Sequence, residues 1–133
     1  MKTRAIPVAN LFRCLETAVT DPLVGIRITR VTGDDEMGMY IAELEPKRRV
    51  TAHFHPHGSE IYCILRGNAR IHTGRPGTRE TVTWDDPADL DEGDSFTVPE
   101  GTVHSLENTG PMPVLFLALA PSSHIGNDRV IVG

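Results

Sequence analysis

Signals for chain reversal recur along most of this sequence, and they constrain the fold more than any other feature. From about residue 21 onward, glycine, proline, asparagine or aspartate interrupts the chain every eight to twelve residues or so. The intervening segments have the length and composition of short strands. This spacing is typical of a sandwich or small barrel, so the predicted fold class is all-β, with a closed or nearly closed architecture.

Ten segments fit such strands: residues 23–31, 39–45, 50–55, 60–65, 69–73, 80–84, 95–98, 103–107, 114–119 and 129–132. Residues 8–19 alone have helical spacing, with Leu11, Cys14, Leu15 and Ala18 on one side. We therefore expect a short N-terminal helical or irregular segment before the barrel.

Size and charge exclude several classes of protein. The 133 residues are enough for one domain with a single core. Thirteen Lys and Arg against eighteen Asp and Glu give a net charge of −5, which argues against a nucleic-acid partner. The longest apolar run, residues 114–120, is too short to cross a bilayer, and the first fifteen residues lack a signal-peptide core. Two distant cysteines suit a reducing compartment, so we expect a cytoplasmic protein without a membrane partner.

Two histidines share one face of the predicted strand 50–55. Side chains alternate along a strand, so His53 and His55 point the same way with Cα atoms about 7 Å apart. Glu60 follows after a turn or arch at residues 56–59. A carboxylate on a second strand can therefore meet the histidine pair.

A third histidine follows a second turn. Pro99 and Gly101 have the spacing of a tight type I reversal, and His104 stands near the start of the next strand. Three imidazole nitrogens and one carboxylate suit a divalent transition metal, either Mn²⁺, Fe²⁺, Ni²⁺, Cu²⁺ or Zn²⁺. The ligand types alone do not select among these ions.

These residues form two spaced patterns that resemble the two motifs of the cupin family. The first is H-x-H-x4-E-x6-G and the second is G-x5-P-x-G-x2-H-x3-N. They are carried by His53, His55, Glu60 and Gly67, and by Gly93, Pro99, Gly101, His104 and Asn108. One position departs from the family, because Lys47 stands where a glycine is expected six residues before His53. The departure puts the preceding turn in question, and Pro46 can supply that turn instead.

The resemblance implies a double-stranded β-helix, the cupin jelly-roll barrel. Its core would cover about residues 23–120 of a single cupin domain, 1–133, and residues 56–59 would bridge the two sheets. It also implies His53, His55, Glu60 and His104 as metal ligands inside the barrel. A six-coordinate ion would then keep about two positions for water or substrate.

The sequence supports less specific predictions for several other side chains. Tyr62 and Ile64 follow Glu60 at even spacing and should face the same interior, as pocket residues or as core. His57 is expected in a loop or beside the ligands. His72 is expected on a solvated strand face and His124 in a surface loop. Three aromatic residues are expected in the core: Trp84, Phe96 and Phe116.

Three functional hypotheses follow from the resemblance. The first is a small-molecule metalloenzyme of the dioxygenase, isomerase or lyase type. The alternative is a non-catalytic cupin that binds or senses a small molecule or sugar, and a weaker third possibility is a barrel whose metal serves stability alone. Small jelly rolls expose sheet edges, so we also expect a homodimer, with residues 1–13 as a candidate for exchange between subunits.

Overall fold

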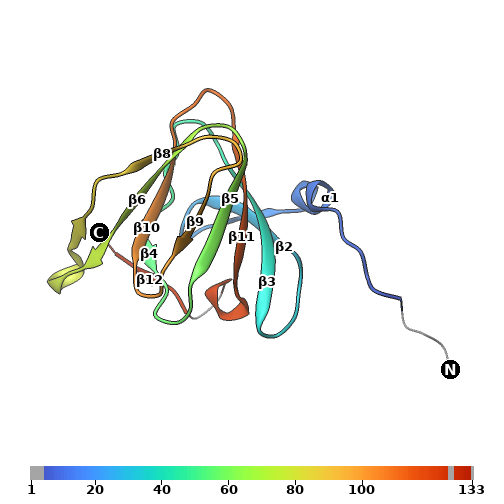
Figure 1. The fold of residues 1–133 in the computed structure, drawn as a ribbon, viewed down its shortest axis with the longest axis horizontal. Helices are drawn as coiled ribbons and strands as arrows, with labels where there is room; N and C mark the ends of the chain where they lie inside the picture. Colours follow the sequence, from blue (N-terminus) through green and yellow to red (C-terminus); the bar gives the residue numbers. More distant parts are fainter. Residues whose placement is uncertain (1–4, 126–127, 133) are drawn as a thin grey trace.

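Two antiparallel sheets face each other and enclose the core (Figure 1). The structure is a computed structural model that describes residues 5–125 and 128–132. The first sheet has the order β1 (Val19–Asp21), β2 (Ile26–Gly33), β3 (Met37–Leu44), β11 (Val114–Pro121), β5 (Glu60–Arg66) and β9 (Ser95–Val98). The second has the order β12 (Val130–Ile131), β4 (His53–Phe54), β10 (Val103–Asn108), β6 (Ala69–Pro76) and β7 (Val82–Trp84), with β8 (Ala88–Leu90) also paired to β6.

The chain alternates between these sheets, which confirms the predicted jelly-roll fold. From β3 to β6, and again from β9 to β12, each strand lies in the sheet opposite its predecessor. Residues 56–59 carry the chain from β4 to β5 and so bridge the two sheets, as expected. Within the described residues, no helix has the length and apolar character needed to cross a membrane.

Side chains that face inward from the strands fill the interior between the sheets. In β5, Glu60, Tyr62 and Ile64 are buried, whereas Ile61 between them is exposed. Ile64 and Phe116 belong to the main hydrophobic cluster. Because successive side chains of a strand point to opposite faces, every second residue of β5 faces the interior. These inward positions hold both a core residue, Ile64, and the polar residue Glu60.

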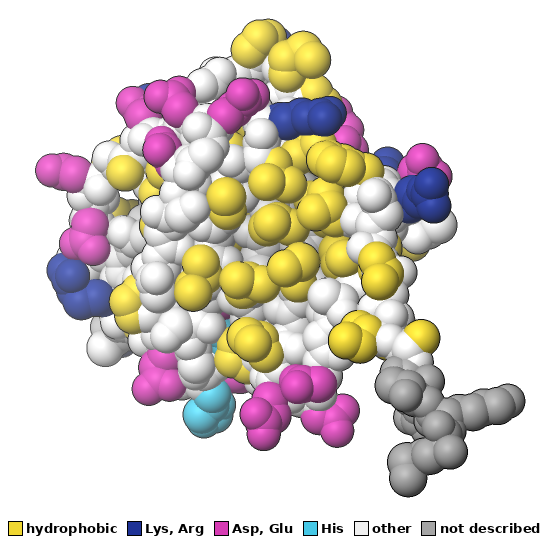
Figure 2. Space-filling view, turned by 45° about the vertical axis from the view of Figure 1, so that its right-hand side comes forward, with side chains coloured by type: hydrophobic (Ala, Val, Ile, Leu, Met, Phe, Trp, Pro, Cys, Tyr) yellow, Lys and Arg dark blue, Asp and Glu magenta, His cyan; other side chains and the backbone are white. Residues whose placement is uncertain are grey.

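The outer face of the first sheet is apolar as well. α1 (Leu11–Glu16) packs on part of it, where Leu15 contacts a second cluster that includes Ile41 and Leu115. Figure 2, which brings the side of β2, β3 and α1 forward, shows hydrophobic side chains gathered across it. The helix begins later than the predicted 8–19 because Asn10 caps it, accepting hydrogen bonds from the backbone N–H groups of Phe12 and Arg13. It also ends earlier, because Val19 already begins β1.

Two positions with positive φ form tight turns within the two sequence motifs or just before them. Arg48 N donates to Glu45 O across 3.2 Å, which makes Lys47, at φ 66°, the third residue of a type II turn. The position that departs from the motif is thus one where glycine is favoured. Likewise Thr102 N donates to Pro99 O, with φ 77° at Gly101. That turn is also type II, so the type I prediction was wrong: Pro99 stands first in the turn and not second.

The strand predictions fail mainly near β7. Glu80, the first residue of the predicted strand 80–84, belongs to a short 3-10 turn, η1 (Thr78–Glu80), and β8 lies between the predicted strands 80–84 and 95–98, where no strand was predicted. Trp84 was predicted in the core but is 42% exposed, because β7 ends the second sheet and, among the described strands, pairs with β6 alone. The indole packs on the outer surface, with its ring 6.4 Å from that of His72 and 5.4 Å from the Arg49 guanidinium.

Candidate metal centre

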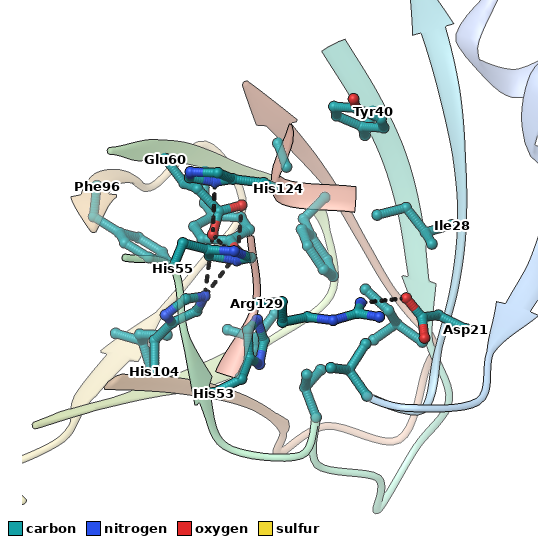
Figure 3. A pocket seen from close by; sticks show the side chains of 18 residues that line it. Asp21, Ile28, Tyr40, His53, His55, Glu60, Phe96, His104, His124 and Arg129 are labelled. Atoms are coloured by element: carbon teal, nitrogen blue, oxygen red, sulfur yellow. Dashed lines mark hydrogen bonds and ion pairs between the residues drawn. The ribbon is translucent and has the colours of Figure 1, made fainter. Parts of the chain in front are cut away.

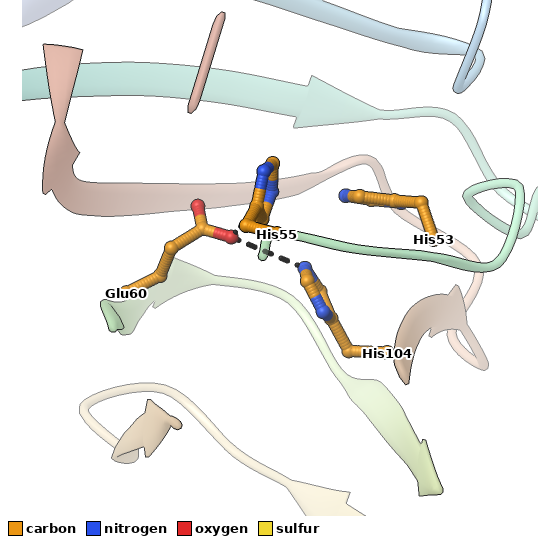
Figure 4. Close-up of side chains that lie close together, drawn as sticks. All are labelled: His53, His55, Glu60 and His104. Carbon is orange, nitrogen blue, oxygen red and sulfur yellow. Dashed lines mark ion pairs between the residues drawn. The ribbon is translucent and has the colours of Figure 1, made fainter. Parts of the chain in front are cut away.

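Four buried side chains converge at one point inside the barrel (Figure 4). His53 lies in β4, His55 just after it, Glu60 at the start of β5 and His104 in β10. One ligand atom from each lies within 4.8 Å of all the others. The structure therefore brings together the four residues that the sequence singled out.

The sheet topology accounts for this convergence. β4 and β10 are antiparallel neighbours whose register places His104 opposite His53. Cross-strand partners on one face have neighbouring side chains, so the two imidazoles meet on the inner face. Glu60 belongs to the opposite sheet and approaches from the facing wall.

Hydrogen bonds fix the orientation of all three imidazoles. The Nδ1 atom of each lies within hydrogen-bonding distance of a backbone carbonyl oxygen: His53 with Thr51 at 2.8 Å, His55 with Asp128 at 2.5 Å, and His104 with Thr102 at 3.1 Å. A carbonyl oxygen can only accept, so each Nδ1 carries the proton and donates it. Each neutral ring then presents the Nε2 lone pair to the interior, as metal-binding histidines do.

These lone pairs face a carboxylate oxygen with no proton between them. Glu60 Oε1 lies 2.8 Å from His55 Nε2 and 3.2 Å from His104 Nε2, yet it is buried and has no hydrogen-bond partner among the described residues. Convergent acceptors repel one another in a medium of low dielectric constant unless a cation lies between them. The chemistry of the donor set thus fits a divalent transition metal ion.

The protonation states also match what a metal requires. Burial lowers the pKa of His53 to about 3, assisted by the neighbouring His104. Burial alone would raise the pKa of Glu60, so a cation beside Oε1 is what favours its ionised form. The site therefore offers a neutral imidazole and an ionised carboxylate, the forms that bind metal ions.

Tyr62 holds the second oxygen of this carboxylate. Its buried hydroxyl donates to Glu60 Oε2 across 3.2 Å and lies 3.2 Å from His104 Nε2. Burial and the charge of Glu60 raise the pKa of Tyr62 well above its usual range, so the hydroxyl stays protonated and remains a donor. Tyr62 thereby orients Glu60 with Oε1 toward the histidines.

A cavity of about 40 Å³ opens beside this cluster (Figure 3). Much of its wall is apolar: Val24, Ile26, Ile28, Val50, Ile71, Phe96, Leu106, Phe116 and Ala118. Tyr62 also lines it, whereas Ile64 is fully buried in the core and is not among the lining residues that the structure describes. Its polar lining beyond the cluster consists of Asp21, Tyr40, His124 and Arg129.

His124 was predicted in a surface loop, and that prediction was wrong. The residue lies in η2 (Ser122–Ile125) and its side chain is 0% exposed. Its ring stacks on His55 at 4.0 Å, and Nε2 donates to His57 O across 2.5 Å. Nδ1 lies 3.7 Å from Glu60 Oε1 and has no hydrogen-bond partner in the described part of the chain. His57 itself is a loop residue with its side chain 86% exposed.

Sequence reasoning also missed an ion pair in the cavity. Arg129 Nη1 donates to Asp21 Oδ2 across 2.5 Å. The two residues come from opposite ends of the chain, so no local spacing indicates that they meet. Locally, Asp21 is a charged residue just before the predicted strand 23–31, and Arg129 is the first residue of the predicted strand 129–132. Both placements equally suit a solvated surface.

Comparisons with known proteins give a consistent result for the fold. A family model described as a cupin domain matches residues 40–120, which include all four clustered residues. A crystal structure of an uncharacterized protein with a double-stranded β-helix domain, from Klebsiella pneumoniae, has a TM-score of 0.66 at 20% identity and covers 99% of each chain. Its likeness concerns the fold.

Curated relatives are larger proteins. Mannose-1-phosphate guanylyltransferase RfbM of Salmonella typhimurium is 27% identical over 88 residues, which are 66% of this chain and 16% of that protein. Putative germin-like protein 2-1 of Oryza sativa subsp. japonica is 27% identical over 108 residues, which are 78% of this chain and 48% of that protein. The chain thus spans half or less of the length of these two relatives.

Proposed function

The chain belongs to the cupin domain family, and from that premise we propose that it binds a divalent transition metal and uses it on a small organic molecule. The proposed class is a small-molecule metalloenzyme of the dioxygenase, isomerase or lyase type. The observation that carries the proposal is the convergence of three Nε2 lone pairs and Glu60 Oε1 in a buried site.

Each side chain has a distinct part in this proposal. His53, His55, Glu60 and His104 would hold the ion, which supplies Lewis-acid activation or redox chemistry when bound. Four protein ligands leave about two positions of a six-coordinate ion for a small molecule. Tyr62 keeps the carboxylate turned toward the ion, and its ring packs on Phe96 with centroids 5.2 Å apart. The apolar wall would exclude water and contact the carbon atoms of the ligand.

Metal content tests the proposal directly. The protein is purified without chelators or added metal and examined by elemental analysis, together with His104→Ala. His72→Ala is the matched control, because His72 lies on the outer surface, where it contacts Glu107 at 2.9 Å. We expect about one ion per chain in the parent and the control, and a large loss in His104→Ala. A parent protein that never holds stoichiometric metal, even after exposure to each candidate ion, would overturn the proposal.

A non-catalytic binding module is the second candidate. It is favoured by the scarcity of free bases among the cavity residues described: Asp21 is paired with Arg129, the pKa of Tyr62 is raised, and outside the four clustered residues Nδ1 of His124 alone is an unpaired base. Oxygen uptake by the metal-loaded protein with catechols, diketones and thiols distinguishes the candidates. Turnover of any member supports the enzyme, whereas thermal stabilisation by a small molecule or sugar without turnover supports the binding module.

A further inference from the structure

A buried guanidinium shares the cavity with the metal cluster. Arg129 precedes β12 and Asp21 ends β1, and in Figure 3 Arg129 extends from the histidine side of the cavity toward Asp21. Their side chains are only 9% and 12% exposed. Charged groups are rarely buried unless they are paired or functional, so the contacts of this pair decide between the two.

The pairing leaves most of the guanidinium unused. An arginine has five N–H donors arranged as a planar fork. Nη1 donates to Asp21 Oδ2, and the described residues provide no second acceptor for the side chain of Arg129. The other carboxylate oxygen, Oδ1, accepts from Leu23 N at 2.9 Å. The geometry is therefore a single contact and not the two-bond fork that arginine forms in its strongest carboxylate pairs.

The charges of the cavity are also unbalanced once a metal is bound. With the lining histidines neutral, Glu60 and Asp21 each contribute one negative charge and Arg129 one positive charge. A divalent ion would then leave one uncompensated positive charge in a largely apolar enclosure. Such a charge is unfavourable in a medium of low dielectric constant, and a bound monoanion would neutralise it.

We propose that Arg129 binds the carboxylate group of the ligand, whose remaining oxygen atoms face the metal cluster. The ligand class is a short hydroxy- or keto-carboxylate, because about 40 Å³ admits few heavy atoms. This inference rests on the proposed function, since it assumes an ion at the cluster. In the absence of the ligand, Asp21 binds the Arg129 guanidinium, and it therefore competes with the ligand carboxylate for that group.

A purely structural ion pair predicts different behaviour. If the pair only ties the C-terminal segment to β1, then Asp21→Asn and Arg129→Gln should destabilise the fold alike and leave ligand preference unchanged. If Arg129 binds the ligand, the two substitutions act in opposite directions. Asp21→Asn removes the competitor and strengthens carboxylate binding, whereas Arg129→Gln weakens it.

The experiment compares glycolate with its neutral analogue glycolamide by calorimetric titration of the metal-loaded full chain. We expect glycolate to bind the parent at least about tenfold more tightly than glycolamide. Arg129→Gln should lose most of that preference, Arg129→Lys part of it, and Asp21→Asn should bind glycolate about threefold or more tightly than the parent. Arg70→Gln is the matched control, because Arg70 forms an exposed pair with Asp89 at 2.7 Å.

Metal content and thermal melting are measured for every variant, so that loss of metal or of folding is separated from loss of binding. If the variants hold metal and Arg129→Gln binds glycolate as tightly as the parent, the inference is overturned while the proposed function stands. Glycolate and glycolamide binding equally to the parent would overturn it too. A parent without metal refutes the proposed function itself. Should Arg129→Gln fail to fold, Asp21→Asn and Arg129→Lys still decide the question.

Discussion

His53 should make the metal-free protein sensitive to acid. In the folded chain burial, together with His104, lowers the pKa of His53 to about 3, whereas histidine in an unfolded chain titrates near 6.5. The unfolded state therefore takes up a proton at a higher pH than the folded state does. The stability associated with neutral His53 is complete above pH 6.5 and is lost progressively as the pH falls toward 3.

The magnitude is large compared with the stability of a typical domain. The gap between 6.5 and about 3 corresponds to roughly 5 kcal/mol in total, of which about 3 kcal/mol is lost by pH 4. A domain of ordinary stability has about 5–15 kcal/mol. Acid should therefore remove a substantial part of the free energy of unfolding before the pH reaches 4.

Urea unfolding of chelator-treated protein at several pH values between 7 and 4 measures this loss. The control is His53→Asn, whose amide can still donate to Thr51 O, as His53 Nδ1 does at 2.8 Å, but does not titrate. Other groups titrate in both proteins, so the difference between them isolates His53. The parent should lose about 3 kcal/mol more than the variant between pH 7 and pH 4. Equal losses in the two proteins would show that His53 is not held neutral by burial.

Three further results are expected. Lys47→Gly should raise the free energy of unfolding by roughly 0.5–1 kcal/mol in chemical denaturation, because φ 66° strains a lysine backbone and relief of this strain exceeds the extra entropy that glycine loses on folding. Equal stabilisation by Lys47→Ala would refute the backbone-strain argument. Tyr62→Phe leaves Glu60 Oε2 without its donor, so metal affinity in a chelator competition should fall about tenfold, and unchanged affinity would refute the orienting role. We also propose that a second copy covers the apolar segment leading into α1, because Ile6 and Val8 on that segment are 86% and 94% exposed. Light scattering should give twice 14.6 kDa, and a monomer mass at high concentration would contradict it.

The fold and the metal cluster were predictable because both depend on local periodicity. Alternation placed His53 and His55 on one face, and the motif spacing identified Glu60 and His104. Side-chain alternation in β5 correctly placed Tyr62 and Ile64 inside the barrel. It could not tell which of the two lines the cavity, because that depends on how β5 lies relative to the opposite sheet.

The wrong predictions concern residues whose burial is set by distant parts of the chain. His124 is preceded by two serines and followed by a glycine within two residues, a context that favours an exposed loop. It is buried because the carbonyl of His57 and the ring of His55, both far away in sequence, hold it. Trp84 shows the converse, since an aromatic residue of a predicted strand lies outside when that strand ends a sheet. The cytoplasmic location and the homodimer stay predictions, and residues 1–4 of the segment expected to exchange lie outside the described residues.

The site has two parts, one inside the segment that matches the family model, residues 40–120, and one outside it. The four clustered residues all lie within residues 40–120, the part that matches the family. Asp21, His124 and Arg129 lie outside it, and so does Asp128, whose carbonyl accepts the hydrogen bond from His55. β12 pairs with β4, the strand that contains His53, and thereby brings the C-terminal segment next to the cluster. If the segments outside residues 40–120 determine which molecule reaches the ion, chains that share the cluster but differ in these segments should hold the same metal and prefer different ligands. That division explains physically why family resemblance can identify the candidate metal cluster, whereas the proposed ligand class is inferred from Arg129 and the charges around it.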